Sequence, residues 1–558
     1  MQNKNRAIAI LATAAVLGQL TVACNSAPES AKQASNNRMN GSVSAPPPVP
    51  QIAPLRASAP AAKSLTAQRT LGQASSPKSD SEPEANGETY DRIEENSFQS
   101  ASNSPLSTFS IDVDAASYSN VRRFINEGKL PPKDAVRIEE LINYFPYDYP
   151  QPESDRPFSI TTEISQAPWN PNHQLVHIGL QGKKISTETI PPSNLVFLID
   201  VSGSMVDANK LPLLKSAFRL LVSELRDKDR VSIVVYAGSA GVVLPPTPGN
   251  QKDKILDALD KLEAGGSTAG GEGIQLAYKL AKDNLIKSGN NRVILATDGD
   301  FNVGVSSDSE LVRLIEQKRN QGIFLTVLGV GMGNLQDSKM EKIANKGNGN
   351  YAYIDNMLEA KKVLVKEMGG TLLTIAKDVK IQLEFNPAKV QAYRLIGYEN
   401  RLLQNQDFQD DKKDAGELGA GHSVTALYEI IPVGVKSDVK FPNVNSSEAS
   451  KAGEKTTFGI DEFMQVRLRY KAPNQATSQL LASSGIDRGL KLEDASTNFK
   501  FSAAVAEYGM VLRDSQYKGK ASFEEVLKLA QQSQGDDLDG YRAEFIRLVE
   551  RSKPLRKQ

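Results

Sequence analysis

The stretch Leu195-Val-Phe-Leu-Ile-Asp-Val-Ser-Gly-Ser204 decides the fold of this chain of 558 residues. Its first five residues form an unbroken apolar run, which is typical of a parallel strand buried on both faces. Asp200, Ser202 and Ser204 follow in the spacing D-x-S-x-S, so side-chain oxygens stand where that strand ends. Ligands of open α/β sheets bind at such strand ends. The stretch therefore predicts an α/β sheet with a functional site directly after a core strand.

Apolar strands and amphipathic helices alternate from this stretch to residue 376. Further strand patterns are VSIVVYAG, the edge-like VVLPP, RVILATDG, IFLTVLGVG and NYAYI, and a long helix is expected from Asn356 to about Ala376. Such alternation is typical of a doubly wound sheet. We therefore predict an α/β central domain over residues 191–376, with a mostly parallel sheet and with β-rich and helical segments on both flanks.

The two flanks carry period-2 strand patterns next to the central domain. The N-terminal flank, 107–190, is expected to hold two helices and then strands, and Asp114 is interpreted as a helix cap rather than a metal ligand. The C-terminal flank, 377–558, is expected to hold strands, a polar loop over 407–422 and three closing helices near 499–513, 522–534 and 539–552. Neither flank alone has enough strands for an independent sheet. We therefore predict that the central domain is inserted into one β-rich unit built from 156–190 and 378–472.

Two more oxygen-bearing positions accompany the D-x-S-x-S stretch. Thr268 lies in a glycine-rich turn before a helix, and Asp298 follows the strand pattern RVILAT. The βα alternation brings these turns to one edge of the sheet. Three hydroxyls and two carboxylates suit Mg²⁺, a hard cation that takes about six oxygen ligands and keeps some waters. We therefore predict a Mg²⁺ site at Asp200, Ser202, Ser204, Thr268 and Asp298, with Mn²⁺ and Ca²⁺ as alternatives.

The D-x-S-x-S spacing, the later Thr and the later T-D-G resemble the metal-ion-dependent adhesion site of von Willebrand factor type A domains. The stretches FSIDVDAASYSNVRRFINEG, ATDGDFNVGV and DAGELGAGHSVTALYEI are similar to a bacterial lipoprotein family with an extra domain before and after the A domain. The resemblance implies that Ser202, Ser204 and Thr268 are direct ligands. Asp200 and Asp298 would bind directly or through water. It also implies a protein partner whose Asp or Glu carboxylate completes the metal sphere, and a last A-domain helix that moves on occupancy.

The N-terminus has the organisation of a secretory leader, with a basic start before the apolar run Ala7–Val22. Thr21-Val22-Ala23-Cys24 resembles a bacterial lipobox, although that pattern prefers Leu where Thr21 stands. The resemblance implies a signal peptide over 1–23 and a lipid on Cys24; the alternative is an exported protein cut nearby. An Asp at position 25 would resemble an inner-membrane retention signal, but residue 25 is Asn. This favours the outer membrane of a two-membrane bacterium. Residues 24–106 are rich in Pro, Ser and Ala, so we expect a disordered tether there.

Composition and motifs exclude several classes of function. The 66 basic and 66 acidic residues balance to a net charge of +0, and aromatic residues make up 6% of the chain, which argues against a nucleic-acid partner. The P-loop spacing is absent, so no nucleotide site is expected. His173 and His177, four apart on a predicted strand, are interpreted as sheet-surface residues that cannot share one zinc ion. His422 is interpreted as a turn residue.

The sequence thus favours a Mg²⁺-dependent protein-binding module of a lipid-anchored cell-envelope protein that is not an enzyme. Two alternatives stay open. One is a structural envelope lipoprotein with an unused metal site. The other is an envelope enzyme whose catalysis lies in the flanks, although neither flank offers a nucleophile, a base and an orienting group in recognisable order.

Overall fold

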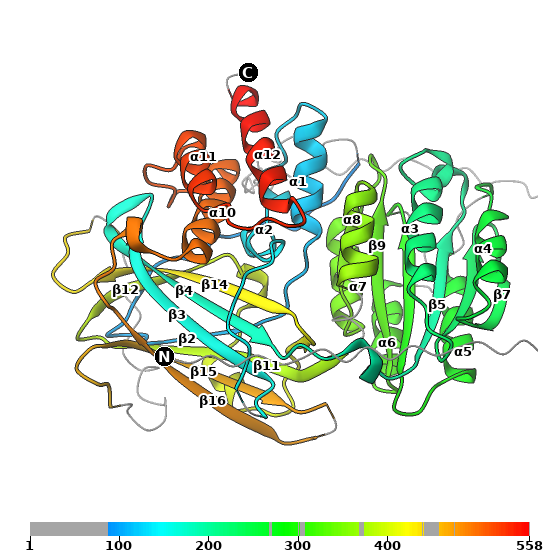
Figure 1. Cartoon of the computed structure of the whole chain (residues 1–558), viewed down its shortest axis with the longest axis horizontal. Coiled ribbons are helices and arrows are strands. Elements are labelled where there is room, and N and C mark those ends of the chain that lie inside the picture. Colours follow the sequence, from blue (N-terminus) through cyan, green and yellow to red (C-terminus); the bar gives the residue numbers. More distant parts are fainter. Residues whose placement is uncertain are drawn as a thin grey trace, which may run out of the picture. The chain divides into compact units, whose positions relative to one another are not determined.

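A computed structural model of the chain describes residues 87–153, 155–266, 270–299, 301, 307–367, 373–437, 439, 457–473 and 475–556 (Figure 1). The predicted signal peptide, Cys24 and the tether up to residue 86 lie outside the described residues. The end of the predicted tether is ordered, which corrects its boundary at 106. Phe98 is buried, and strand β1 (Gln99–Ser100) pairs with a strand far along the chain. None of the described helices combines the length and the apolar character that a membrane crossing needs.

The central domain is built on a sheet of six strands in the order β10-β9-β8-β5-β6-β7. Neighbouring strands are parallel except for β6 and β7, which are antiparallel. Their bounds are β5 Ser193–Asp200, β6 Arg230–Tyr236, β7 Ala240–Pro248, β8 Asn290–Thr297, β9 Ile323–Val330 and β10 Tyr351–Ile354. This is the doubly wound, mostly parallel sheet that the sequence predicts.

Helices cover both faces of this sheet, and strand β5 explains why (Figure 1). Leu195, Phe197 and Ile199 point into a core shared with α3, α4 and α8. Val196 and Leu198 point the other way, into a core shared with α5, α6 and α7. Because both faces are apolar, both must be covered. The helix bounds are α3 Leu211–Ser223, α4 Lys252–Asp260, α5 Gly270–Asp283, α6 Asp308–Arg319, α7 Asp337–Lys346 and α8 Met357–Lys361.

The predicted long helix over 356–376 is wrong at its C-terminal end, where residues 374–376 belong to a strand. Asn356 caps the start of α8, where its side-chain oxygen accepts hydrogen bonds from two backbone N–H groups at 2.8 and 3.0 Å. The helix then passes into a π-helical turn, η4 (Lys362–Lys366), and strand β11 already begins at Thr374. The β-branched Thr374 and Ile375 favour strand over helix there.

The flanks together form two sheets around one core. One sheet has the order β1-β12-β14-β4-β3, and the other β13-β11-β15-β16, with β2 also pairing to β11. Apolar side chains of both sheets share a hydrophobic core that includes Ile178, Phe385 and Val466. Their bounds are β2 Leu106–Ser110, β3 Phe158–Ala167, β4 Asn170–Gly182, β11 Thr374–Phe385, β12 Val390–Ile396, β13 Gly416–Gly419, β14 Ser423–Pro432, β15 Glu462–Lys471 and β16 Ser478–Ile486.

Strand β4, before the central domain, pairs with β14, after it, from Gln174↔Ile430 to Gln181↔Ser423. The prediction that the central domain is inserted into one β-rich unit is therefore confirmed. Three strands were not foreseen. β1 lies inside the predicted tether, and β13 lies inside the stretch predicted to be a loop, where it pairs with β11. β16 follows β15 as an edge strand.

Five helices from both flanks share a core on the other face of the first sheet (Figure 1). The three predicted closing helices are present. The bounds are α1 Ala116–Asn126, α2 Ile138–Asn143, α10 Thr497–Arg513, α11 Phe523–Gln532 and α12 Tyr541–Leu555. Short 3-10 turns complete the described chain: η1 Lys133–Ala135, η2 Thr187–Thr189, η3 Gly203–Val206, η5 Glu399–Arg401, η6 Asn405–Phe408 and η8 Leu492–Asp494.

This helical layer overturns the prediction that His173 and His177 lie on a sheet surface. Both are buried, because helices cover that face of β4. His173 Nδ1 lies 2.5 Å from a carboxylate oxygen of Glu429. His177 Nε2 lies 2.9 Å from the Tyr149 hydroxyl, and burial lowers the pKa of His177 to about 3. His177 is therefore a neutral core residue at physiological pH.

A buried arginine ties the flank to the end of the central domain. Arg122 of α1 donates to both carboxylate oxygens of Asp355 and, at 2.7 Å, to Glu359 of α8. The Tyr144 hydroxyl donates to the same Glu359 oxygen at 2.8 Å. Arg122 and Glu359 are only 2% and 1% exposed, so removal of the cation would leave an uncompensated buried carboxylate.

We predict that Arg122→Met lowers the free energy of unfolding by about 3–5 kcal/mol, which is typical for breaking a buried ion pair by removing one partner. The measurement is denaturant unfolding followed by circular dichroism. Arg313→Met, on the exposed side of α6, is the control and should change stability by less than about 0.5 kcal/mol. Equal stability of the two variants would contradict the role given to Arg122.

Candidate metal centre

The pairing of β5 with β8 brings two carboxylates to one edge of the central sheet. β5 ends at Asp200, and Asp298 directly follows the end of β8. The two strands are parallel neighbours in register from Ser193↔Asn290 to Ile199↔Ala296, so their carboxyl ends meet. Asp200 and Asp298 are both fully buried. Two like charges buried together are costly unless a cation accompanies them.

The loop after β5 folds back onto Asp200. The Ser202 N–H donates to the Asp200 carboxylate at 2.9 Å, and the Ser202 and Ser204 hydroxyl oxygens lie 3.1 Å apart. The glycine-rich turn that contains Gly266 contacts this loop, because the Gly203 N–H donates to the Gly266 carbonyl at 3.0 Å. Thr268 lies outside the described residues, so its predicted position beside Ser202 stays a prediction.

Glycine is required at two turns beside the carboxylates. Gly266 has φ +92°, a left-handed conformation that favours glycine. Gly299, directly after Asp298, has φ +118°, and a Cβ there would lie 2.2 Å from the Asn334 carbonyl oxygen. Glycine at position 299 therefore permits the close approach of the Asn334 carbonyl next to Asp298.

The surroundings affect the two carboxylates differently. Burial raises the pKa of Asp200, hydrogen bonds from Ser202 oppose that rise, and the charge of Asp298 adds to it. Burial also acts to raise the pKa of Asp298, but hydrogen bonds from Lys210, Ser204 and Asn334 outweigh it and leave the pKa below its ordinary value. Asp298 is thus held firmly in its ionised form.

The sequence reasoning missed Lys210. This lysine stands at the N-cap of α3, is 6% exposed, and donates from Nζ to Asp298 Oδ2 at 2.9 Å. Its side chain passes beside Gly331, where a Cβ would lie 2.4 Å from the lysine Cε. No spacing rule marks Lys210, since only the folded chain brings α3 and the turn after β9 together at Asp298. A lysine directly before the apolar helix start Leu211-Pro-Leu-Leu214 is the one signal in the sequence.

The residues present fit a hard divalent cation. Asp200, Ser202, Ser204 and Asp298 supply only oxygen atoms, which is the ligand type that Mg²⁺ takes. The serine oxygens and the carboxylates already converge through the contacts given above. These four residues, with Thr268, would hold the ion. A bound ion would supply an electron-poor centre able to accept a further oxygen ligand.

A second carboxylate cluster lies elsewhere, at the joint between the flank and the central domain. Oxygen atoms of Asp114, Glu140 and Glu341 lie within 4.8 Å of one another. Arg137 donates to Glu140 at 2.5 Å, and Arg401 lies 3.3 and 3.1 Å from Asp114 and Glu341. The two arginines supply the positive charge that a metal would otherwise bring, so we interpret this cluster as an ion-pair network.

Asp114 does not cap α1, contrary to the sequence prediction. Its carboxylate accepts instead from the Tyr351 N–H of β10 at 2.8 Å, while the N-cap position is Ala115 and makes no side-chain hydrogen bond. The hydrogen bond from Tyr351 of the central domain thus takes the place of the predicted capping bond to α1.

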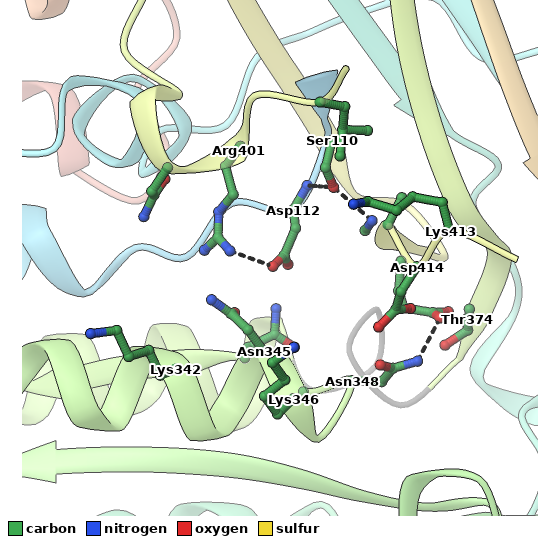
Figure 2. A pocket seen from close by; sticks show the side chains of 18 of the residues that line it. Ser110, Asp112, Lys342, Asn345, Lys346, Asn348, Thr374, Arg401, Lys413 and Asp414 are labelled. Carbon is green, nitrogen blue, oxygen red and sulfur yellow. Dashed lines mark hydrogen bonds and ion pairs between the residues drawn. The ribbon is translucent and has the colours of Figure 1, made fainter. Parts of the chain in front are cut away.

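A cavity of about 510 Å³ opens beside this network, lined by the central domain and by residues of both flanks. Figure 2 shows Arg401 and Asp112 pointing toward one another at its wall, 3.1 Å apart. His422, predicted to line a turn, is among the lining residues. Asp414 pairs with Arg319 at 2.5 Å, and Asn348 donates to Glu417 at 2.9 Å. Most of its charged side chains thus take part in ion pairs, either within the lining or with residues outside it, and the lining does not define a ligand.

Comparison with known proteins divides the chain in three. Residues 194–366 match the von Willebrand factor type A domain, residues 84–177 match a family described as von Willebrand factor, and residues 370–555 match a family described as Uncharacterized protein YfbK, C-terminal. The chain therefore contains a von Willebrand factor type A domain, called the A domain below.

Individual proteins are also similar to this chain. The Escherichia coli (strain K12) protein described as Uncharacterized protein YfbK is 44% identical over 468 residues, which cover 83% of this chain and 80% of that protein. A Synechocystis protein, Uncharacterized protein sll0103, is 30% identical over 172 residues, covering 30% of this chain and 39% of its own. A solved structure, von Willebrand factor type A from Catenulispora acidiphila, is 19% identical and covers 71% of this chain and 91% of that one, with a TM-score of 0.38. The chain belongs to the bacterial YfbK family, which confirms the predicted A domain between N-terminal and C-terminal flanking regions, while the lipid anchor stays a prediction.

Proposed function

We propose that this chain captures a partner protein through a Mg²⁺ ion held at the carboxyl edge of the A-domain sheet, and that a lipid on Cys24 anchors it to the cell envelope. The observation that carries the proposal is the convergence of Asp200, Ser202, Ser204 and Asp298 at that edge. On this proposal the chain is a binding protein and not an enzyme.

The chemistry of capture follows from the ligand set. Neutral hydroxyls and at most two carboxylates would leave the ion short of negative charge and short of ligands, since Mg²⁺ takes about six oxygens. An Asp or Glu side chain of the partner supplies both. Ser202 and Ser204 hold the near side of the site, and Asp200 fixes their loop through the Ser202 N–H. Asp200 in a chain that lacked the two serines and their loop would bind the ion more weakly.

The anchor determines where capture takes place. A lipid on Cys24 would hold the chain at a membrane surface, which is the outer membrane in a two-membrane bacterium. On this proposal the A domain captures its partner at that membrane.

Two alternative functions make different use of the metal site and the flanks. A structural envelope lipoprotein would leave the metal site unused, and an envelope enzyme would place catalysis in the flanks. Chelator-sensitive partner capture separates binding from the structural alternative. An activity screen of a variant that lacks the metal ligands addresses the enzyme.

We predict that Asp200→Ala and Thr268→Ala abolish Mg²⁺ binding and partner capture. The first removes a carboxylate at the site, and the second removes a predicted hydroxyl ligand at a helix start, where cap loss costs about 0.5–2 kcal/mol. Mg²⁺ binding is measured by calorimetry, and capture by crosslinked pull-down from the native envelope with Mg²⁺ or with chelator.

Asp207→Ala is the matched control, because Asp207 is an exposed carboxylate near the site but outside the motif. It should bind Mg²⁺ and the partner as the unaltered chain does. A partner captured equally by Thr268→Ala and the unaltered chain, with and without chelator, would place the binding surface on the flanks.

We predict that Cys24→Ser moves the chain from the membrane fraction to the soluble fraction. A lipoprotein of this type carries more than one acyl chain, and each buried CH₂ contributes about 0.8 kcal/mol to anchoring. The measurement is detergent partitioning of cell fractions. Unchanged partitioning would mean that Cys24 carries no lipid.

A further inference from the structure

We infer that Lys210 is a fixed positive charge that makes the metal ion and the partner carboxylate bind interdependently. It weakens the binding of Mg²⁺ alone and strengthens the capture of a carboxylate by the loaded site. The inference deepens the proposed function and rests on it.

The position of Lys210 is built into the fold. Its Nζ donates to Asp298 Oδ2 at 2.9 Å. The side chain is 7% exposed, and its partner is fully buried. The aliphatic stem runs beside Gly331, where any larger residue would take its place. Packing therefore holds the ammonium within reach of the metal ligands.

Charge balance shows what this ammonium does. With Asp200 and Asp298 at −1 each and Lys210 at +1, the empty site carries −1 − 1 + 1 = −1. Mg²⁺ would bring it to −1 + 2 = +1, and a carboxylate would then bring it to 0. Without Lys210 the same steps run −2, 0 and −1. A buried site is most stable near neutrality, because burial weakens the solvation of any net charge.

The site with Lys210 and the site without it therefore favour different ligand states. With Lys210, the ion alone leaves a surplus positive charge, and the acidic ligand removes it. Without Lys210, the ion alone already gives neutrality, and an acidic ligand adds a charge. The lysine thus couples the two ligands, so that each increases the affinity of the other. A lysine that serves only as a structural ion pair would change stability and leave this coupling unaltered.

The test compares the full chain with Lys210→Met, which keeps the length of the stem and removes the charge. Mg²⁺ is titrated by calorimetry at fixed ionic strength, in chloride and then with acetate as the carboxylate probe. Lys210→Met should bind Mg²⁺ at least about tenfold more tightly in chloride, since unit charges a few ångströms apart interact strongly near a protein surface. Acetate should tighten Mg²⁺ binding to the unaltered chain and should not tighten it in Lys210→Met.

Two control variants separate charge from packing. Lys254→Met removes an exposed lysine of α4 and should match the unaltered chain in both buffers. Lys210→Arg keeps the charge and should keep the gain from acetate. Thermal unfolding is followed in parallel, and Mg²⁺ should raise the Tm of Lys210→Met more than that of the unaltered chain.

The failures are distinguishable. If neither the unaltered chain nor Lys210→Met binds Mg²⁺, the proposed function itself is wrong. If both bind it with equal affinity and equal response to acetate, the metal site stands and the role of Lys210 is overturned. Lys210→Met that folds only with Mg²⁺ supports the inference, because the ion then supplies the missing charge. Lys210→Met that is unfolded with and without Mg²⁺ shows a purely structural lysine and overturns it.

Discussion

The structure depends on the burial of two carboxylates side by side. The parallel pairing of β5 with β8 forces Asp200 and Asp298 to the same edge, and both are cut off from water there. A fold tolerates this only if positive charge and N–H donors meet them. The Ser202 N–H, the Lys210 ammonium and the glycine-dependent turns at 266 and 299 meet that requirement. The groups that surround the candidate metal centre are thus the same ones that allow β5 and β8 to end next to two buried carboxylates.

The sequence predicts the parts of the fold that local pattern controls. The apolar run before Asp200 predicts a buried parallel strand, and alternate β5 residues enter the two cores. The ligand residues could be placed at one edge because parallel strands end together. The insertion of the A domain followed from counting strands, since neither flank could close a sheet alone. The pairing of β4 with β14 resolves that shortage.

The predictions for His173, His177 and Asp114 failed because they depend on elements that cover a surface or reach it from far along the chain. β4 reads as an alternating strand, but its pattern does not say that a helical layer from both flanks covers the face of His173 and His177. Asp114 has the position of a helix cap, yet the Tyr351 N–H and Arg401 engage it from other elements. Lys210 reaches Asp298 only after folding. Long-range partners of this kind leave no spacing in the sequence.

The insertion also determines how the A domain is held. The chain enters it after β4 and leaves it through α8 and η4 into β11, so both crossings lead into the same β-rich unit. At the exit, Arg122 binds Asp355 and Glu359 together, and Tyr144 binds Glu359 as well. The last helix of the A domain therefore cannot shift by itself, because a shift would break a buried ion pair at a cost of about 3–5 kcal/mol. The buried ion pair thus joins α1 of the flank to α8 of the A domain, in addition to the chain connections at the two crossings.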